Sequence, residues 1–206
     1  MSMSLSQLPI NLFDLVVIVV LGAGIFRGRK HGMSAELLSL LMWLAILLGC
    51  SAAYEPGAEL IGQFTDMFSQ LTCYLLAYVG GALLIFLLFV GIKRVFSGKL
   101  LGSDIFGRTE YYLGMGSGLV RASCMLLAGL ALLNARYFSP AEVRAMEKRD
   151  IDIYGSDFFP GLHTLQTTVF NQSLTGPWIK DNLGYFLIKP TQPATAEHHQ
   201  KEAVFQ

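Results

Sequence analysis

Four long apolar stretches constrain this chain more than any other feature of its sequence. A helix needs about 20 mainly apolar residues to cross the roughly 30 Å hydrocarbon core of a bilayer, and about 17 are sufficient. The stretches that meet this length lie at residues 10–26, 37–53, 74–92 and 111–133. Because lipid offers no hydrogen-bond partner to backbone N–H and C=O groups, each stretch has to be helical. The sequence therefore predicts an all-α, multispanning membrane helix bundle with about four transmembrane helices.

The composition agrees with a membrane protein. Of the 206 residues, 53% are hydrophobic and 15% are charged, whereas a soluble domain carries about 25% charged residues. The 15 basic and 15 acidic residues cancel, so no overall charge attracts the protein to nucleic acid. We expect the lipid bilayer, together with further copies of the chain or other membrane proteins, as partners, and no nucleic acid.

Basic residues in the loops predict the orientation, because short loops rich in Lys and Arg stay in the cytoplasm. The loop between the first two spans carries Arg27, Arg29 and Lys30, and the connector at 93–110 is also basic. The connector at 54–73 has acidic residues and no Lys or Arg. The alternation places both termini outside the cytoplasm.

The connector at 54–73 also has a helical pattern. Its apolar residues recur on one side of a helix, namely Leu60, Ile61, Phe64, Met67, Phe68 and Leu71. Such a helix lies on the membrane surface, or else its apolar face packs on the outer ends of the spans. At the start of the second span, Ser34 is a candidate helix cap.

Residues 136–206 follow the predicted bundle of residues 1–135 and are expected to form an extramembrane tail. Ser139 and Glu142 resemble the cap and first turn of a short helix. An amphipathic segment begins near Leu162 and is expected to end at Gly176 and Pro177. The polar stretch from residue 190 to the end is predicted to be disordered.

Three ionisable residues fall within or beside the predicted spans, where a charge costs about 2.5–3.5 kcal/mol on insertion scales. Arg121 is about ten residues into the fourth span, Asp14 is near the start of the first, and Glu36 begins the second. We predict a buried polar cluster of these three residues. It serves as a polar pathway or ligand-binding charge, or it fixes helix register through an ion pair of Arg121 with Asp14 or Glu36.

Small residues define one face of the fourth span. Gly114, Gly118 and Ala122 are four residues apart, and this spacing lets membrane helices approach closely. Matching surfaces are available at Gly22–Gly24 and Gly80–Gly81. The pattern predicts tight packing within the bundle or between copies, and a flexible gate is the alternative.

Neither metal nor catalytic chemistry is indicated. The three cysteines lack metal-ligand spacing, although Cys50 and Cys73 both fall near the outer face, where a disulfide is possible. No catalytic motif of a hydrolase or metalloprotease occurs, so we expect no catalytic residue, no cofactor and no enzyme. The alternatives are a small oligomeric channel or transporter subunit, and a membrane-anchored enzyme subunit with its chemistry in the tail around Asp157 and His163.

Taken in order, these features resemble the colicin V production protein family (CvpA), which consists of small bacterial multispanning proteins. In that family an Asp opens the first span, an Arg-Gly turn follows, and the second span begins with Glu-x-Leu-Ser-Leu before a Trp. The matching residues here are Asp14, His31-Gly32, residues 36–40 and Trp43.

The last span of the family carries Gly-x-x-x-Gly-x-x-Arg-Gly after an Asp-bearing loop. The corresponding residues are Asp104, Gly114, Gly118 and Arg121. The chain departs from the pattern at His31, where the family has Arg, and at Ala122, where it has Gly.

The resemblance covers residues 12–133 and leaves the tail without a counterpart. It implies a bacterial inner-membrane protein with no defined activity. Its implied role is in toxin production or export, as for colicin V, and in envelope homeostasis.

Overall fold

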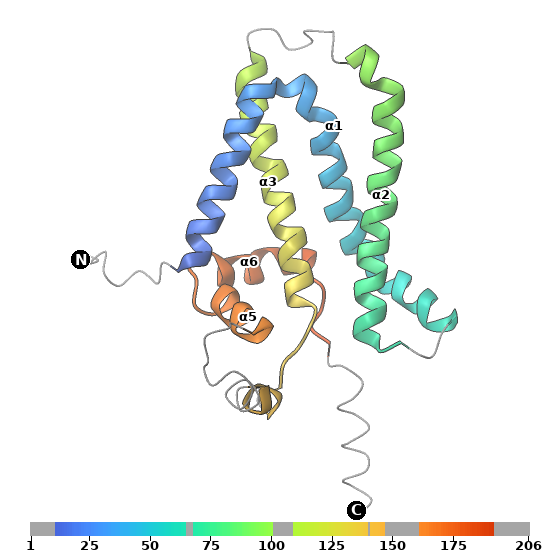
Figure 1. Cartoon of the computed structure of the whole chain (residues 1–206), viewed down its shortest axis with the longest axis vertical. Coiled ribbons are helices and arrows are strands. Elements are labelled where there is room, and N and C mark those ends of the chain that lie inside the picture. Colours follow the sequence, from blue (N-terminus) through green and yellow to red (C-terminus); the bar gives the residue numbers. More distant parts are fainter. Residues whose placement is uncertain (1–10, 65–67, 101–108, 140, 147–160, 192–206) are drawn as a thin grey trace, which may run out of the picture.

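The computed structural model describes residues 11–64, 68–100, 109–139, 141–146 and 161–191, and this part of the chain is all-α as predicted. Three long helices dominate it: α1 (Leu12–Phe64), α2 (Gln70–Leu100) and α3 (Glu110–Asn134). Two short helices, α5 (Leu162–Phe170) and α6 (Thr175–Leu183), and the 3-10 turn η3 (Gly184–Phe186) follow. Figure 1 shows these short elements gathered at one end of the long helices.

Helix α1 is a hairpin broken at Gly32. This residue has φ 73° and ψ 171°, a backbone conformation that is open essentially only to glycine. We call residues 12–31 the N-terminal arm and residues 33–64 the second arm (Figure 1). Arg27, Arg29 and Lys30 lie in the last turns of the N-terminal arm, so the predicted basic loop is helical up to the break.

The predicted cap at Ser34 is wrong. The Ser34 hydroxyl oxygen is buried and has no hydrogen-bond partner among the described residues. Instead the backbone N–H of Ser34 donates to Oε1 of Glu110, at 3.3 Å. A carboxylate from the first turn of α3 thus satisfies the start of the second arm, where the helix dipole favours negative charge.

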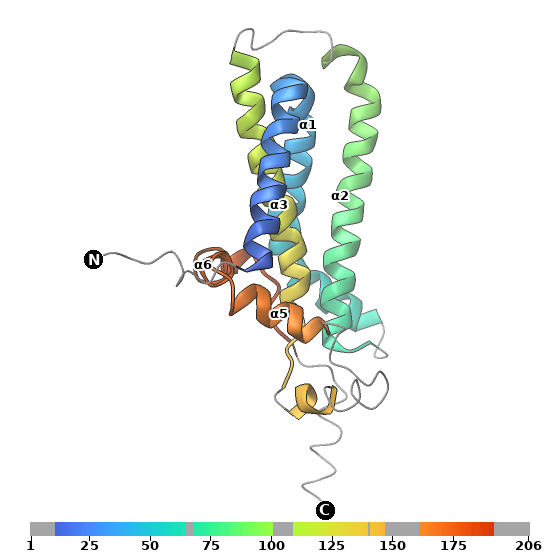
Figure 2. The same ribbon diagram turned by 60° about the vertical axis from the view of Figure 1, so that its left-hand side comes forward.

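Helix α3 lies between the two arms of α1, and α2 packs on the outer side of the second arm (Figures 1 and 2). The N-terminal arm contacts α3 through glycines, since Gly24 and Gly28 lie against Gly114 and Gly118. The second arm contacts α3 through apolar side chains, among them Leu47 against Cys124 and Leu127. Helix α3 is therefore the central element of the bundle.

Three described helices are long and apolar enough to cross a membrane, rather than the four that the sequence predicted. They are Glu36–Phe64, Gln70–Val95 and Glu110–Asn134. The N-terminal arm is not among them because Asp14 and Arg27 bracket its uncharged part, residues 15–26. At 1.5 Å per residue this part is about 18 Å long, well short of the roughly 30 Å core of a bilayer.

The second arm bends near its end. Pro56 lies inside the helix and removes one backbone hydrogen bond, and beyond it the chain turns outward in Figure 1. The part of the predicted connector helix up to Phe64 is therefore present, with Leu60 and Phe64 exposed. Residues 65–67 lie outside the described part.

The hydrophobic core sits at the end of the bundle away from the Gly32 break. The two most completely buried large side chains are Tyr78 of α2 and Ile188, which follows η3. The core cluster is formed by the second arm, α2, α3 and the tail. Its buried members are Ile46, Cys50, Tyr54, Tyr78, Leu130, Ala131, Ala135, Val169, Phe170, Leu187 and Ile188. Residues 161–191 are therefore packed as part of the bundle's core.

The tail helices follow the sequence pattern in part. Ser139 and Glu142 form a reciprocal capping box, in which each backbone N–H donates to the other side chain, at 3.1 and 3.2 Å, and residues 141–146 are helical. Helix α5 covers the predicted amphipathic segment. The expected break at Gly176 and Pro177 is wrong, because both residues lie in the first turn of α6, where proline is tolerated. The prediction of disorder from residue 190 falls mostly on residues 192–206, outside the described part.

The disulfide between Cys50 and Cys73 is not formed, since all three cysteines of the chain are free and buried. A Cβ atom on Gly81 would lie 3.5 Å from the Cys50 sulfur. Cys73 is eight residues before Gly81 in α2, about 12 Å along the helix axis. That offset exceeds the Cα separation of about 7 Å that a disulfide can bridge.

Candidate functional site

The N-terminal arm and α3 touch through their backbones. Gly24, Gly28 and Gly32 recur every four residues on one face of α1. A Cβ on Gly118 would meet the Gly24 carbonyl oxygen and lie 3.0 Å from the Gly28 Cα, and a Cβ on Gly24 would lie 2.6 Å from the Ala122 Cβ. The predicted face of Gly114, Gly118 and Ala122 is thus used within the bundle, as membrane helices use small residues.

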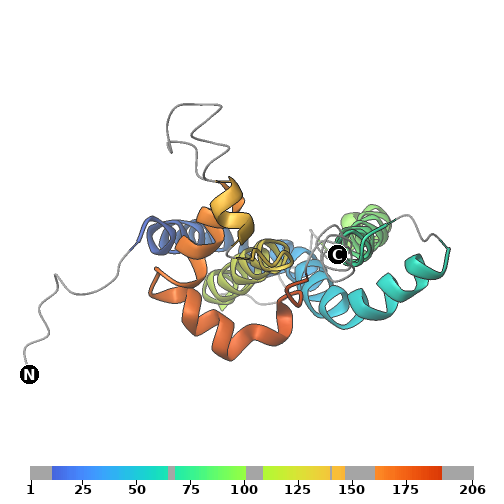
Figure 3. The same cartoon turned by 90° about the horizontal axis from the view of Figure 1, so that it is seen from below.

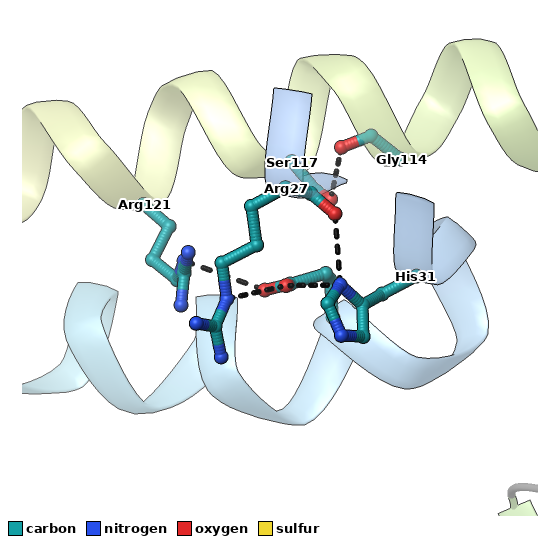
Figure 4. A network of polar contacts seen from close by, with 6 residues as sticks. Arg27, His31, Gly114, Ser117 and Arg121 are labelled. Atoms are coloured by element: carbon teal, nitrogen blue, oxygen red, sulfur yellow. Dashed lines mark hydrogen bonds and ion pairs between the residues drawn. The ribbon is translucent and has the colours of Figure 1, made fainter. Parts of the chain in front are cut away.

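This close contact brings a charged cluster together just below the Gly32 break. Glu36 lies one helical turn after the break and is 4% exposed. Its Oε1 lies 3.4 Å from Nε of Arg27 and 4.0 Å from Nδ1 of His31. Its Oε2 lies 3.3 Å from Nε of Arg121, on α3. Figure 4 shows Arg27, His31 and Arg121 converging from two helices.

The cluster contains more positive than negative charge. Two arginines face one carboxylate, and the side chain of Arg121 is only 12% exposed, against 61% for Arg27. Nε of Arg121 and Oε2 of Glu36 are both buried without a directed hydrogen bond to any described residue. The pair is therefore held by charge at 3.3 Å, with hydrogen-bonding capacity left over.

Neighbouring polar groups are partly satisfied by backbone carbonyls. The His31 ring nitrogen Nδ1 lies 3.0 Å from the carbonyl oxygen of Arg27. The Ser117 hydroxyl donates to the carbonyl oxygen of Gly114, at 2.9 Å, as Figure 4 also shows. The ring of His31 is thereby oriented toward Glu36.

Asp14 does not belong to this cluster. Its carboxylate accepts hydrogen bonds from the backbone N–H of Leu174 and Thr175, at 3.1 and 3.0 Å, and from the Thr175 hydroxyl, at 2.6 Å. It also accepts from the N–H of Asn11, at 3.0 Å. Asp14 therefore joins the start of α1 to the start of α6, at the far end of the bundle (Figure 1).

Replacing Asp14 with alanine is expected to loosen α6 from the bundle. The Ser173 hydroxyl accepts from the N–H of Gly176, at 2.8 Å. Asp14 caps the N–H groups of Leu174 and Thr175, so loss of the Asp14 cap is expected to cost about 0.5–2 kcal/mol. Hydrogen exchange in α6 should become faster while exchange in α2 stays unchanged. Equal protection of α6 in the variant and the parent would contradict this role for Asp14.

Sequence reasoning missed two members of the cluster, Arg27 and His31. The sequence pattern places Arg27 in the basic cytoplasmic loop between the first two predicted spans. The available signal was the repeat of Gly24, Gly28 and Gly32, which has the same spacing as Gly114 and Gly118. Recognising it would have placed Arg27 on the helix beside Glu36.

Among the described residues, no group of three His, Cys, Asp or Glu side chains is arranged to hold a metal ion. Of the residues considered for chemistry in the tail, His163 lies on α5 with its ring 5.8 Å from that of Phe138. Asp157 lies outside the described residues, as does Asp104.

Comparison with known proteins adds one finding. A family model described as colicin V production protein matches residues 13–163. No curated protein and no solved structure was found to match the chain. The match covers more than two thirds of the 206 residues, and it extends beyond residue 133, where the resemblance seen in the sequence ended. The chain therefore belongs to the colicin V production protein family.

Proposed function

We propose that this chain is a non-enzymatic protein of the bacterial inner membrane that assists toxin production or export and envelope homeostasis, with the Glu36 cluster as its working part. The observation that carries the proposal is the buried Glu36 carboxylate with Arg121 at 3.3 Å. Ionisable groups inside membrane helices are costly, so they mark functional positions by default. Oε2 of Glu36 and Nε of Arg121 have no hydrogen-bond partner among the described residues. This supports a role in a polar pathway rather than a purely structural ion pair.

The proposed topology has the Gly32 break in the cytoplasm and both termini outside it. The basic residues of the N-terminal arm and Lys93 and Arg94 of α2 lie toward the same end of the molecule, which supports this orientation. The N-terminal arm contacts α3 from Gly32 to Gly24, and its outer face is apolar and exposed, for example at Ile18 and Val19. We therefore include it in the membrane as a fourth crossing whose charged ends reach the two surfaces.

Replacing Arg121 with leucine tests this function. In a strain lacking its own copy, the variant should fail to restore secretion of a colicin V-like peptide toxin and survival under detergent stress. Immunoblots of the membrane fraction should show the protein still in place. The matched control is Ser123→Leu, two residues further along α3, where the half-buried side chain donates within the helix to the carbonyl oxygen of Leu119, at 3.0 Å.

A double variant separates function from structure. Glu36→Leu combined with Arg121→Leu removes both charges, and such replacements of buried ion pairs are often neutral or stabilising. We expect a stable but inactive protein. If the double variant restored secretion and survival, the cluster would only fix helix packing and the proposal would fail.

A small oligomeric channel is the second candidate, because α2 presents an exposed apolar face on the side away from the second arm. Only 6% of its membrane-crossing window is buried, and Leu83, Leu84 and Leu87 are all exposed. This surface faces lipid or further copies of the chain. Conductance of the purified protein in planar bilayers, abolished by Arg121→Leu, would favour the channel over an accessory role.

Removing the tail does not distinguish these functions from an enzyme in the tail. Ile188 is fully buried against the bundle, and Asn134 of α3 donates to its carbonyl oxygen, at 2.9 Å. Truncation after Tyr137 would expose this core, so activity should be lost under every reading. Substitution of His163 with Gln is the sharper test, and we expect secretion to be unchanged.

A further inference from the structure

A pocket of about 550 Å³ lies at the end of the bundle opposite the Glu36 cluster. It is bounded by the chain leaving α3, by the helical residues 141–146, and by α5 and α6, which Figure 3 shows together from below. This volume is within the range of about 300–1,000 Å³ that is typical of small-molecule sites. Asn134, the last residue of α3, lines it, so the pocket lies where a membrane span ends.

The charged residues in the described lining of this pocket are all basic. Its described lining contains Arg136, Arg144 and Lys180 together with His163, and no Asp or Glu. Nε of Arg136 is buried and has no hydrogen-bond partner among the described residues. A buried guanidinium donor without an acceptor is costly, which indicates that an anionic acceptor belongs there.

The position of Arg136 is fixed before any ligand arrives. The guanidinium carbon of Arg136 stacks 4.6 Å from the centre of the Phe138 ring, and the other contact of that ring is with His163, edge to face at 5.8 Å. The Gln166 amide donates to the carbonyl oxygens of Leu133 and Arg136, at 3.3 and 3.0 Å. The chain that leaves α3 is therefore held in place, so little conformational entropy is lost when a ligand binds.

The segment that leaves α3 is also hydrogen-bonded to the last described residue of the chain. Thr191 donates its N–H to the carbonyl oxygen of Ala135, at 2.9 Å, and accepts from the N–H of Tyr137, at 3.2 Å. Lys189, two residues before Thr191, pairs with Glu55 at 2.7 Å, and this hydrogen bond raises the pKa of the Lys189 ammonium. Both neighbours of Arg136 are thus held by backbone hydrogen bonds, which further fixes the position of Arg136.

We propose that this pocket binds a phosphate group, presented either by the headgroup of an anionic phospholipid or by a soluble phosphate compound. Guanidinium groups bind phosphate oxygens through two parallel hydrogen bonds, and an ammonium adds a point charge. Two arginines and one lysine match the negative charge of such a group. The site is separate from the Glu36 cluster and does not depend on the proposed function.

Titration of the purified full-length protein tests this site. Binding is measured by calorimetry with inorganic phosphate in a neutral detergent, and by co-sedimentation with phosphatidylcholine vesicles with and without phosphatidylglycerol. Arg136→Gln and Lys180→Gln should each weaken binding about tenfold or more, because each removes a charged hydrogen-bond donor. Lys180 is exposed on α6, so its variant should keep the parent's melting temperature.

Lys93→Gln is the matched control, with the same change of charge at the opposite end of the molecule. It should leave binding unchanged. Binding of inorganic phosphate identifies the phosphate group itself as the ligand, and binding only to vesicles with phosphatidylglycerol identifies a lipid headgroup as its source. Absence of binding to both probes, or equal weakening by Lys93→Gln and Lys180→Gln, would overturn the proposal.

Discussion

Replacing Gly118 with leucine is expected to drive the N-terminal arm away from α3 and destabilise the whole bundle. Any side chain at this position meets the backbone of Gly24, and a Cβ would come within 3.0 Å of the Gly28 Cα. Overpacking a well-packed interior costs about 1–3 kcal/mol and occasionally more. Because the obstructing atoms are backbone atoms of a helix, which cannot rotate away, we expect the loss at or above the upper end of that range.

The control for this variant lies two residues away. Gly116 is on the same helix, and a Cβ there has no atom within 4 Å. Gly116→Leu should be neutral or slightly stabilising, because leucine exceeds glycine in helix propensity by nearly 1 kcal/mol. Thermal unfolding in detergent measures both variants. Similar melting temperatures for Gly118→Leu and Gly116→Leu would show that the two helices do not meet at their glycines.

Glu36→Gln should destabilise the bundle more than Arg121→Gln does. The glutamine keeps the shape of the side chain but leaves Arg121, whose side chain is 12% exposed, without an anion. Removing one partner of a buried ion pair typically costs about 3–5 kcal/mol. Arg121→Gln should cost less, because Arg27 still lies 3.4 Å from the Glu36 carboxylate.

Arg27→Gln is the matched control within the cluster. Arg27 is 61% exposed, and exposed ion pairs contribute about 0–1 kcal/mol. The predicted order of melting temperatures is therefore Arg27→Gln above Arg121→Gln above Glu36→Gln. If Arg27→Gln melted at a lower temperature than Arg121→Gln, Arg27 rather than Arg121 would be the main partner of Glu36.

Local patterns in the sequence were sufficient to predict the helices and the close-packed face of α3. Hydropathy identifies a membrane helix, and a four-residue repeat identifies the face that carries Gly114 and Gly118, because both are properties of a single helix. The same information placed Glu36 and Arg121 as candidate partners. The N-terminal arm has a shorter uncharged part than the other predicted spans, because Asp14 and Arg27 lie at its two ends, and whether it crosses the membrane stays a prediction.

Contacts between distant segments could not be predicted in this way. Asp14 binds Thr175, which is 161 residues away in the chain, and no periodicity connects the two. Glu110 replaces Ser34 as the cap of the second arm for the same reason. A helical pattern shows which face of a helix is buried, but the packing of all the helices decides how far two neighbours are shifted along their axes. The prediction of a Cys50–Cys73 disulfide was wrong because the two cysteines lie at different heights in the bundle.

The most direct test is to determine on which side of the membrane each end of the bundle lies. The native cysteines are buried and can be replaced, after which Lys30→Cys and Asn171→Cys each introduce one exposed thiol. In intact cells, a membrane-impermeant maleimide should label residue 171 and not residue 30, and in inverted membrane vesicles the pattern should reverse. Labelling of both positions from the same side would contradict a bundle that crosses the membrane between them.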